Sequence, residues 1–463
     1  MEKNTMRVAK SAHPLKRHTS PSLSSTIISH SVETLKPFPD NPRQHSEKQV
    51  LQLMRAIKVN GFTNPVLMDE SGTILSGHGR LEAAKRLGMA TMPVLIYSGC
   101  SPEQKRAIVL GENRLAELSA WDPKCLKLQL EALIEVDFDV EITGFSTAQV
   151  NLIIDGPPAS TSNDPQDILP PIPSQSVSRR EDIWLLGDHK LICGDSREQT
   201  VYLSLLAHEK AQMVLTDAPY NVKIHGHARG KGRVRHREFR MASGEMSDMG
   251  FRDFLRDVMN SVVPVCLDGS LHYWFMDWRH FPILLAAGNA CYDEWKQLLV
   301  WNKVNAGMGT FYRSQHELIA IFKHGNHTHI NNFGLGDGGR YRTNVIDYPG
   351  MTLATARNRK ERDLHPTVKP IGLLAGLIQD CSSRGGIILD PFSGSGSTIL
   401  AAERTGRKAR AIEIDPAYVD VALTRWQEMT GKPAILAGTN TTFDQVSRDR
   451  SATSNPSDEE EGN

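Results

Sequence analysis

Cysteines are few in this chain and none are paired in a motif. Six cysteines are scattered over 463 residues, and no two of them form a Cys-x-x-Cys arrangement. This pattern is typical of reduced thiols in the cytoplasm and argues against a disulfide framework or a zinc site. We therefore expect a cytoplasmic protein without a structural metal.

Long apolar runs are also missing. No run approaches the roughly 20 residues that span a bilayer, and the N-terminus lacks the apolar core of a signal peptide. Basic and acidic residues balance at 53 each, so the zero net charge indicates no class of partner. The hydrophobic content of 40% is ordinary for a globular protein. The length predicts two or three domains. Because long apolar runs are missing, we expect no contact with a membrane.

Changes in composition divide the chain into five segments. Residues 1–29 are rich in Ser, Lys and Arg without periodicity, and we expect a disordered tail there. Residues 30–154 combine short strands and helices, as in a small α+β domain with a helical extension. Residues 155–180 hold six prolines and are predicted to be a linker. Residues 181–443 alternate apolar strands with helical patterns, which predicts an α/β fold with a doubly wound, mostly parallel sheet. Residues 444–463 are expected to be an acidic disordered tail.

A glycine-rich turn follows a predicted strand late in the chain. In IILDPFSGSGSTILAAERTG, the strand ends at Asp390 and a helix begins near Ser397. Glycines let the backbone approach a ligand, and a helix N-terminus favours a negative group. The next strand ends at Glu413 and Asp415, and an acid at that place commonly binds ribose hydroxyls. Alone, the turn has the alternative of a tight βα corner, but with the acidic strand end it indicates a nucleoside-containing cofactor.

Four motifs in the C-terminal half occur in a recognisable order. VLTDAPYNV places an acid, a proline and a tyrosine directly after a buried strand, and LGDHKLICGDS, HPTVKP and DPFSGSGS lie around it. With these motifs, residues 182–440 resemble the S-adenosyl-L-methionine-dependent DNA amino-methyltransferases in the permuted order of the beta group. DAPY resembles their catalytic Asp-Pro-Pro-Tyr motif, and DPFSGSGS resembles their cofactor loop. The resemblance implies a Rossmann-like methyltransferase domain that binds S-adenosyl-L-methionine and acts on double-stranded DNA.

The DAPY turn suits the methylation of an exocyclic amine, whose lone pair is delocalised into the base. By the resemblance, the Asp217 carboxylate and the Ala218 carbonyl accept the two amine hydrogens and make the nitrogen nucleophilic. Tyr220 would stack on the base, which must leave the duplex to be reached. Proline is usual in place of Ala218, so we expect a softer turn, in which Pro219 still disfavours helical angles at residue 218. The alternative for Asp217 is a turn residue without a catalytic role.

The resemblance also implies a set of cofactor contacts. Asp195 would face the adenine ring, on which Phe392 would pack. His365 and Lys369 would lie near the methionine carboxylate, and the charge of Lys369 makes it the better ligand. Glu413 is the expected ribose ligand, and Asp415 is the second candidate. The full set is Asp195, His365, Lys369, Asp390, Phe392, Ser393, Gly394, Ser395, Gly396 and Glu413. The alternative for each is a helix cap or a surface charge.

The clearest basic patch follows the DAPY turn. The segment KIHGHARGKGRVRHREFR carries seven Lys or Arg and one Glu, and we expect it to bind DNA phosphates. Its basic residues are Lys223, Arg229, Lys231, Arg233, Arg235, Arg237 and Arg240. The alternative is a solvated flexible loop. Its three histidines have no Cys or carboxylate at ligand spacing, so no metal site is predicted. Residues 325–363 are irregular and polar, and target-recognition segments lie at this place in the family.

The N-terminal region, about residues 32–122, resembles the ParB-like nuclease domain, which is also related to sulfiredoxin. The resemblance rests on DNPRQH, GFTNPVLMDESGTILSGHGRLEAAKRLG and ENRLAE. The turn at Gly77, His78, Gly79 and Arg80 between a strand and a helix would suit a phosphate. The sulfiredoxin cysteine has no counterpart here. We expect a DNA-binding accessory domain. Nucleotide binding is the second interpretation, nuclease activity the third, and a scaffold without a ligand the alternative.

The sequence therefore predicts a site-specific DNA methyltransferase that modifies the exocyclic amine of a flipped base. Asp rather than Ser at position 217 favours adenine N6 over cytosine N4. One rival is a DNA-binding ParB-like regulator with a weakly active methyltransferase domain. Another is a protein-glutamine or RNA methyltransferase, in which the cofactor loop normally precedes the catalytic turn. The expected partners are double-stranded DNA and, at the ParB-like domain, a nucleotide; a homodimer stays open.

Overall fold

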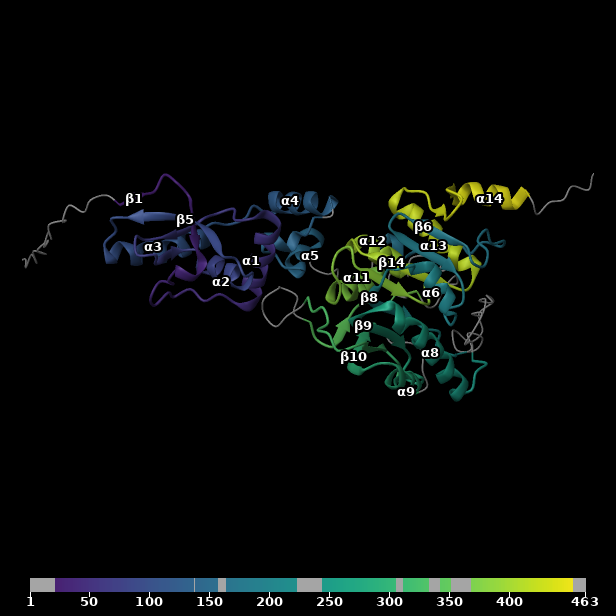
Figure 1. Cartoon of the computed structure of the whole chain (residues 1–463). Coiled ribbons are helices and arrows are strands. Elements are labelled where there is room, and N and C mark those ends of the chain that lie inside the picture. The colour runs from purple at the N-terminus through teal and green to yellow at the C-terminus, as the bar shows by residue number, and fades with distance from the viewer. Residues whose placement is uncertain are drawn as a thin grey trace, which may run out of the picture. The chain divides into compact units, whose positions relative to one another are not determined.

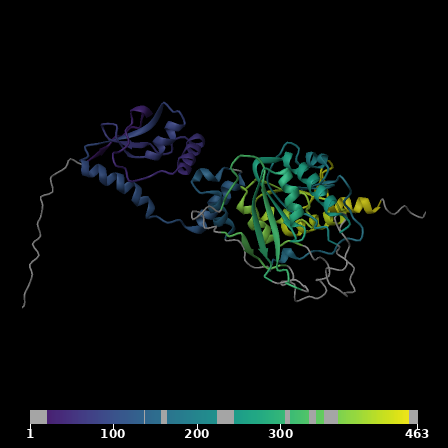
Figure 2. The same cartoon turned by 90° about the horizontal axis from the view of Figure 1, so that it is seen from below.

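The computed structural model divides into two compact units between residues 146 and 147. Figures 1 and 2 show the chain from two sides. Within the described part of the chain, no helix has the length and apolar character needed to cross a membrane. The described residues are 21–136, 138–156, 164–222, 244–304, 311–332, 342–350 and 368–452.

The first unit is an α+β domain whose described residues form one five-stranded sheet. The strand order is β1-β5-β3-β4, and β2 also pairs with β5. Strands β3 and β5 are parallel, and α2 packs against this sheet through Leu81 and Ala84. The elements are β1 (Ser22–Leu23), β2 (Ile28–Ser31), η1 (Val32–Thr34), α1 (Glu47–Asn60), β3 (Val66–Met68), β4 (Ile74–Ser76), α2 (His78–Arg86), β5 (Thr91–Ser98), α3 (Pro102–Glu117), α4 (Pro123–Glu135) and η2 (Val140–Thr143).

Residues 21–29 differ from the disordered tail predicted over 1–29. Strand β1 pairs with β5 through Ser22↔Ser98, and β2 pairs with β5 through Ile28↔Val94. These pairings supply backbone hydrogen bonds that depend on a partner about 70 residues away. Local composition contains no sign of that partner, so the prediction of disorder is wrong for residues 21–29.

The second unit contains a sheet of eleven described strands. Their order is β12-β10-β11-β9-β8-β13-β14-β7-β6-β15-β16. The elements are α5 (Thr147–Asp155), η3 (Pro165–Asp167), β6 (Ile183–Leu186), β7 (His189–Cys193), α6 (Gln199–Leu206), β8 (Ala211–Asp217), α8 (Asp248–Val262), η4 (Val263–Val265), β9 (Cys266–Met276), α9 (Phe281–Cys291), β10 (Glu294–Asn302), β11 (His316–Lys323), β12 (Val345–Asp347), α11 (Ile371–Asp380), β13 (Ile387–Asp390), α12 (Ser397–Thr405), β14 (Lys408–Glu413), α13 (Pro416–Thr430), β15 (Ile435–Leu436), β16 (Thr441–Thr442) and α14 (Phe443–Ala452).

The centre of this sheet is parallel and covered on both faces. Strands β9, β8, β13, β14 and β7 run parallel, whereas β10, β11 and β6 pair antiparallel at the flanks. Successive residues of β8 enter opposite cores, because side chains alternate along a strand. Met213 packs with residues of α11, α12 and α13, and Val214 packs with residues of α6, α8 and α9. The predicted doubly wound α/β fold is confirmed.

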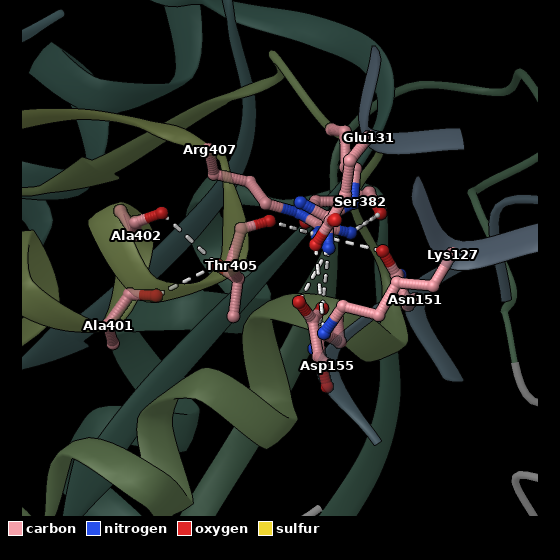
Figure 3. Close-up of polar contacts among 11 residues, drawn as sticks. Lys127, Glu131, Asn151, Asp155, Ser382, Ala401, Ala402, Thr405 and Arg407 are labelled. Carbon is pink, nitrogen blue, oxygen red and sulfur yellow. Dashed lines mark hydrogen bonds and ion pairs between the residues drawn. The ribbon is translucent and has the colours of Figure 1, made fainter. Parts of the chain in front are cut away.

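The second unit begins before the linker that the prolines predict over 155–180. Helix α5 packs against α11, and Figure 3 shows its side chains beside Arg407. Arg407 Nη1 donates to Asn151 Oδ1 at 3.2 Å, and Arg384 Nη2 lies 2.7 Å from both carboxylate oxygens of Asp155. Further along, Asp164 pairs with Arg404 at 2.5 Å. The described part of the predicted linker is therefore bound to the second unit by buried or half-buried polar contacts.

The C-terminal segment also differs from its predicted state. Residues 444–452, predicted within an acidic tail, belong to α14. Val446 of this helix is buried in the core of the second unit. Arg450 Nη1 pairs with Asp182 Oδ2 at 2.5 Å and fixes the helix to the start of the domain.

The contact between α9 and β11 depends on Gly288. A Cβ at this position would lie 2.1 Å from the Phe322 ring, which is itself fully buried. We predict that Gly288→Ala destabilises the second unit by about 1–3 kcal/mol, because the ring or the helix must shift. Urea unfolding followed by tryptophan fluorescence measures this change.

Gly250→Ala is the matched control in the same unit. Gly250 lies on the exposed side of α8, where a Cβ meets nothing closer than 3.4 Å. Gly250→Ala should leave the free energy of unfolding unchanged or raise it by up to about 1 kcal/mol, which is the difference in helix propensity between Gly and Ala. Equal losses for both substitutions would contradict the packing explanation.

Candidate active site

The candidate site lies where three parallel strands end. Strand β8 ends at Asp217, β13 ends at Asp390 and β14 ends at Glu413. Since β13 pairs with both β8 and β14, these three carboxylates follow neighbouring strands at one edge of the sheet. Thr216 Oγ1 donates to Asp390 Oδ1 at 2.8 Å and ties the DAPY strand to the glycine-rich turn. The carboxyl edge of a parallel sheet is where ligands bind in open α/β folds.

Two donors hold the Asp217 carboxylate. Lys369 Nζ lies 2.5 Å from Asp217 Oδ2, and the Tyr220 hydroxyl donates to Asp217 Oδ1 at 2.8 Å. Lys369 also donates to the Tyr220 oxygen at 3.1 Å and lies 5.4 Å from the centre of its ring. The Asp217 side chain keeps 27% of its surface exposed, whereas Lys369 keeps 6%. The carboxylate is thus open to a ligand on one side and fixed by buried partners on the other.

Glu317 and Lys303 complete the same cluster, and neither was predicted from the sequence. Glu317 Oε2 lies 3.2 Å from Lys369 Nζ and 3.2 Å from the Tyr220 hydroxyl, and Glu317 Oε1 pairs with Lys303. The sequence places Lys303 directly after β10 and Glu317 second in β11, but it does not show that the two strands pair. A hairpin brings such residues to the same edge of a sheet.

The lysines and carboxylates of this cluster shift the pKa values of their neighbours. Burial raises the pKa of Asp217 above its usual value; the Lys369 ammonium opposes this, and the Glu317 carboxylate adds to it. Burial acts in the same direction on Glu317, but Lys369 and Lys303 outweigh it and lower the pKa of Glu317 to about 2. The two neighbouring carboxylates therefore differ, and Glu317 is the one held firmly ionised.

The turn that carries Asp217 is held by Asn221. This residue adopts a positive φ of 53°. Its side-chain oxygen accepts from the backbone N–H groups of Gly244 and Met246, and its amide donates to the Met246 carbonyl. Ala218 is 1% exposed and packs in the core between β8 and α8. Asn221 thus fixes the end of the turn, just past Tyr220.

The glycine-rich turn adopts a conformation that excludes side chains. Gly394 and Gly396 have φ values of 52° and 83°, and a Cβ on Gly396 would lie 2.7 Å from the Cβ of Ala422. The N–H of Gly394 donates to Glu413 Oε2 at 2.8 Å. Helix α12 begins directly after the turn, at Ser397. A helix N-terminus behind an open glycine turn suits a ligand with negative groups.

The acids around this turn have raised pKa values. Burial raises the pKa of Glu413 to about 7, although the N–H groups of Asp415 and Gly394 oppose it. Burial also raises the pKa of Asp390 to about 6, against hydrogen bonds from Thr398 and Thr216. Asp415 caps α13 by accepting from Ala417 N at 3.1 Å, which is a structural use for the second candidate ribose ligand.

The remaining predicted cofactor residues surround the same turn. Arg197 donates to Asp195 Oδ2 at 2.7 Å, so this buried acid already has a partner. Phe392 is half-buried, with its ring centre 5.9 Å from that of Phe254. Arg425 donates to the Ser395 hydroxyl at 3.1 Å, whereas the buried Ser393 Oγ has no hydrogen bond within the described residues. Ser393 is thus the one with a hydroxyl left for a ligand.

Some predicted site residues lie outside the described part of the chain. They are His365 and the basic residues Lys223, Arg229, Lys231, Arg233, Arg235, Arg237 and Arg240. Among the described residues, no group of His, Cys, Asp and Glu is arranged to hold a metal ion.

The predicted phosphate turn of the first unit opens α2. Gly77 caps the helix with φ 102°, and a Cβ on it would meet Val66 at 2.9 Å. The N–H of Phe38 donates to His78 Nε2 at 3.1 Å, and Arg80 Nη1 donates to the Asn64 carbonyl at 2.8 Å. Burial lowers the pKa of His78. The turn is therefore neutral at its histidine and tied by its arginine to the loop before β3.

Three family models match successive parts of the chain. Residues 17–114 match the ParB N-terminal domain, residues 124–180 match the ParB-methyltransferase HTH domain, and residues 211–424 match the DNA methylase family N6/N4. The HTH match includes the residues whose composition predicts a linker.

Individual relatives are similar to parts of the chain. The ParB-like nuclease domain-containing protein YnaK of Escherichia coli is 48% identical over 80 residues, which are 17% of this chain and 92% of YnaK. The type II methyltransferase M.ScaI of Streptomyces caespitosus is 40% identical over 87 residues, which are 19% of this chain and 29% of M.ScaI. The crystal structure of the M1.HpyAVI–SAM complex aligns with 51% of this chain and 98% of its own, at 16% identity and a TM-score of 0.37.

The charge cluster yields a test of stability. We predict that Lys369→Met costs about 3–5 kcal/mol at pH 8, because Asp217 and Glu317 lose their shared cation. The loss should be smaller at pH 5. Without Lys369 the pKa values of the Asp217 and Glu317 carboxyl groups rise in the folded state. As the pH rises, the unfolded state releases protons that the folded state still holds, so the stability of the variant falls. Urea unfolding at the two pH values measures the difference.

Lys432→Met serves as the control, since Lys432 is exposed at the end of α13. It should change stability little at either pH. A pH-independent loss for Lys369→Met would contradict the electrostatic explanation.

Proposed function

We propose that this chain methylates an exocyclic amine of a DNA base. The chain belongs to the ParB-like nuclease domain family in its N-terminal part, and it carries an N6/N4-type DNA methylase domain. The observation that carries the proposal is the position of Asp217. Its partly exposed carboxylate ends β8, next to the glycine-rich turn that follows the neighbouring β13. Methyl transfer needs a group that accepts the amine hydrogens, and this group must lie next to the cofactor pocket.

The glycine-rich turn fits S-adenosyl-L-methionine. Gly394 and Gly396 open the backbone, Glu413 can accept ribose hydroxyls, and the free Ser393 hydroxyl is a further polar contact. Bound there, the cofactor supplies an electrophilic methyl group on its sulfonium. We assign cofactor binding to Asp195, His365, Lys369, Asp390, Phe392, Ser393, Gly394, Ser395, Gly396 and Glu413.

Asp217 and the Ala218 carbonyl activate the amine. Each accepts one amine hydrogen, which draws the nitrogen lone pair away from the ring and towards the methyl group. Tyr220 holds the flipped base by stacking, and Pro219 keeps residue 218 extended. Lys369 and Tyr220 each donate to one oxygen of Asp217. The substrate amine therefore approaches the exposed side of the carboxylate and competes with these donors.

Adenine N6 is the proposed target rather than cytosine N4. The support is chemical: position 217 is Asp, a charged acceptor, where the resemblance associates Ser with cytosine. The DNA phosphates bind the basic segment 223–240, and the ParB-like domain acts as a second DNA-binding part. Binding to DNA should weaken strongly with salt, because phosphate contacts release counterions.

The proposal predicts transfer of label from S-adenosyl-L-methionine to duplex DNA. Asp217→Ala should lower the rate at least about 100-fold, because one preorganised acceptor is lost. After digestion of the DNA to nucleosides, the label should be found on N6-methyl-2′-deoxyadenosine. Asp253→Ala, at an exposed position of α8, is the control and should retain the rate. Preferential labelling of RNA or protein would overturn the substrate assignment.

A second prediction concerns cofactor binding and pH. With a pKa of about 7 in the free protein, Glu413 is mostly protonated at pH 6 and mostly ionised at pH 8. Only the ionised form offers all its lone pairs to the ribose hydroxyls. Affinity should therefore rise about tenfold from pH 6 to pH 8. Isothermal titration calorimetry checks this value.

Glu413→Gln isolates that contribution. Its affinity should be lower at pH 8 and should lose the part of the pH dependence that Glu413 causes. The same pH dependence in the variant and the parent would contradict the role of Glu413 as the ribose ligand.

A further inference from the structure

Glu317 stands within reach of both donors that occupy Asp217. Its Oε2 lies 3.2 Å from Lys369 Nζ and 3.2 Å from the Tyr220 hydroxyl. The corresponding distances to Asp217 are 2.5 Å and 2.8 Å. Each donor is therefore shared between two carboxylates and lies closer to Asp217.

This sharing matters because each oxygen of Asp217 already accepts one hydrogen bond, from Lys369 or from Tyr220. A substrate amine that binds on the exposed side of Asp217 competes with the Lys369 ammonium and the Tyr220 hydroxyl for these two oxygens. Lys369 is almost fully buried, so its displaced charge has little access to water. A buried ammonium without an acceptor is strongly unfavourable, so displacement requires a second acceptor nearby.

We propose that Glu317 is that acceptor, a positioning residue that takes over the hydrogen bonds of Lys369 and Tyr220 when the substrate amine occupies Asp217. The inference rests on the proposed function. No covalent bond changes in this step, and both donors keep their protons. Lys369 and Tyr220 need to move only from a closer to an already neighbouring oxygen. Asp217 is then free to accept an amine hydrogen.

Lys303 equips Glu317 for this role. It pairs with Glu317 Oε1, so the other oxygen of the carboxylate faces Lys369 and Tyr220. Together Asp217, Glu317, Lys369 and Lys303 form a cluster without net charge. The two lysines keep the pKa of Glu317 at about 2, and Glu317 therefore remains an ionised acceptor over the whole working range of pH.

The test compares Glu317→Gln with the parent in single-turnover methylation of duplex DNA by the full chain. With a neutral side chain at 317, Lys369 should stay on Asp217. The rate of methyl transfer should fall by about 10–100-fold, the effect of losing a charged hydrogen bond. The KM for S-adenosyl-L-methionine should change by less than about twofold, because only Asp217 is blocked.

A pH profile separates this role from a merely structural one. The ionisable groups around Asp217 are Lys369, Tyr220, Glu317 and, across the glycine-rich turn, Asp390. Removing the negative charge of Glu317 lowers the pKa of Asp217. The acid limb of the rate profile should therefore move to lower pH in Glu317→Gln. Glu317→Asp keeps the charge and should recover part of the rate, which also covers the case that Glu317→Gln folds poorly.

Glu294→Gln is the control, because Glu294 begins the neighbouring β10 at an exposed position and pairs with Lys296. It should match the parent in rate and profile. If the parent methylates DNA and Glu317→Gln has the same rate and acid limb, the inference is overturned.

A readout without activity separates the two proposals. Carbon-13 NMR titration of the Asp217 carboxyl, assigned with Asp217→Asn, measures its pKa in the unliganded chain. A lower pKa in Glu317→Gln supports the inference. An unchanged pKa overturns it. A parent chain that does not methylate DNA refutes the proposed function, and this titration then still decides the coupling of Glu317 to Asp217.

Discussion

The candidate site of the second unit depends on one ion pair, between Lys369 and Asp217. Asp217 ends a central strand, and Lys369 lies just before α11, which packs on one face of the sheet. Both charges need each other, because neither has enough water around it to be stable alone. Their pairing holds the DAPY turn against the segment before α11 and leaves one side of the carboxylate open. The proposed catalytic geometry and the local stability thus depend on the same contact.

The sequence predicted the parts of this site that follow from strand ends. Asp217, Asp390 and Glu413 each follow a buried apolar run, and parallel strands bring such ends to one edge. The glycine turn was predictable for the same reason, because Gly394 and Gly396 adopt positive φ angles that other residues disfavour. These features are local, so composition and order were sufficient to find them.

Partners from distant segments were not predictable in this way. Glu317 and Lys303 enter the site only because β10 and β11 form a hairpin beside β9. Arg425 likewise donates to Ser395 from a helix 30 residues along the chain. In these cases a tertiary contact brings the polar groups together, and a single sequence contains no record of such contacts. The partner of Asp195 is local, since Arg197 lies two residues further on.

The polar segments near the unit boundaries illustrate the same limit. Proline and small polar residues over 155–180 predicted a linker, yet Asp164 and Asp167 bind Arg404 and the N–H of Ile371. The bond to Ile371 lies two residues after Lys369. These residues, within the segment matched by the HTH family model, therefore support the loop that carries Lys369.

The most direct test of the account is a crystal structure of the full chain with S-adenosyl-L-methionine. The account predicts the ligand in the turn at Gly394 and Gly396, with its ribose on Glu413 and its sulfonium methyl facing Asp217. A ligand bound elsewhere, or one whose methyl group points away from Asp217, would contradict the central claim that this carboxylate prepares the amine for methyl transfer.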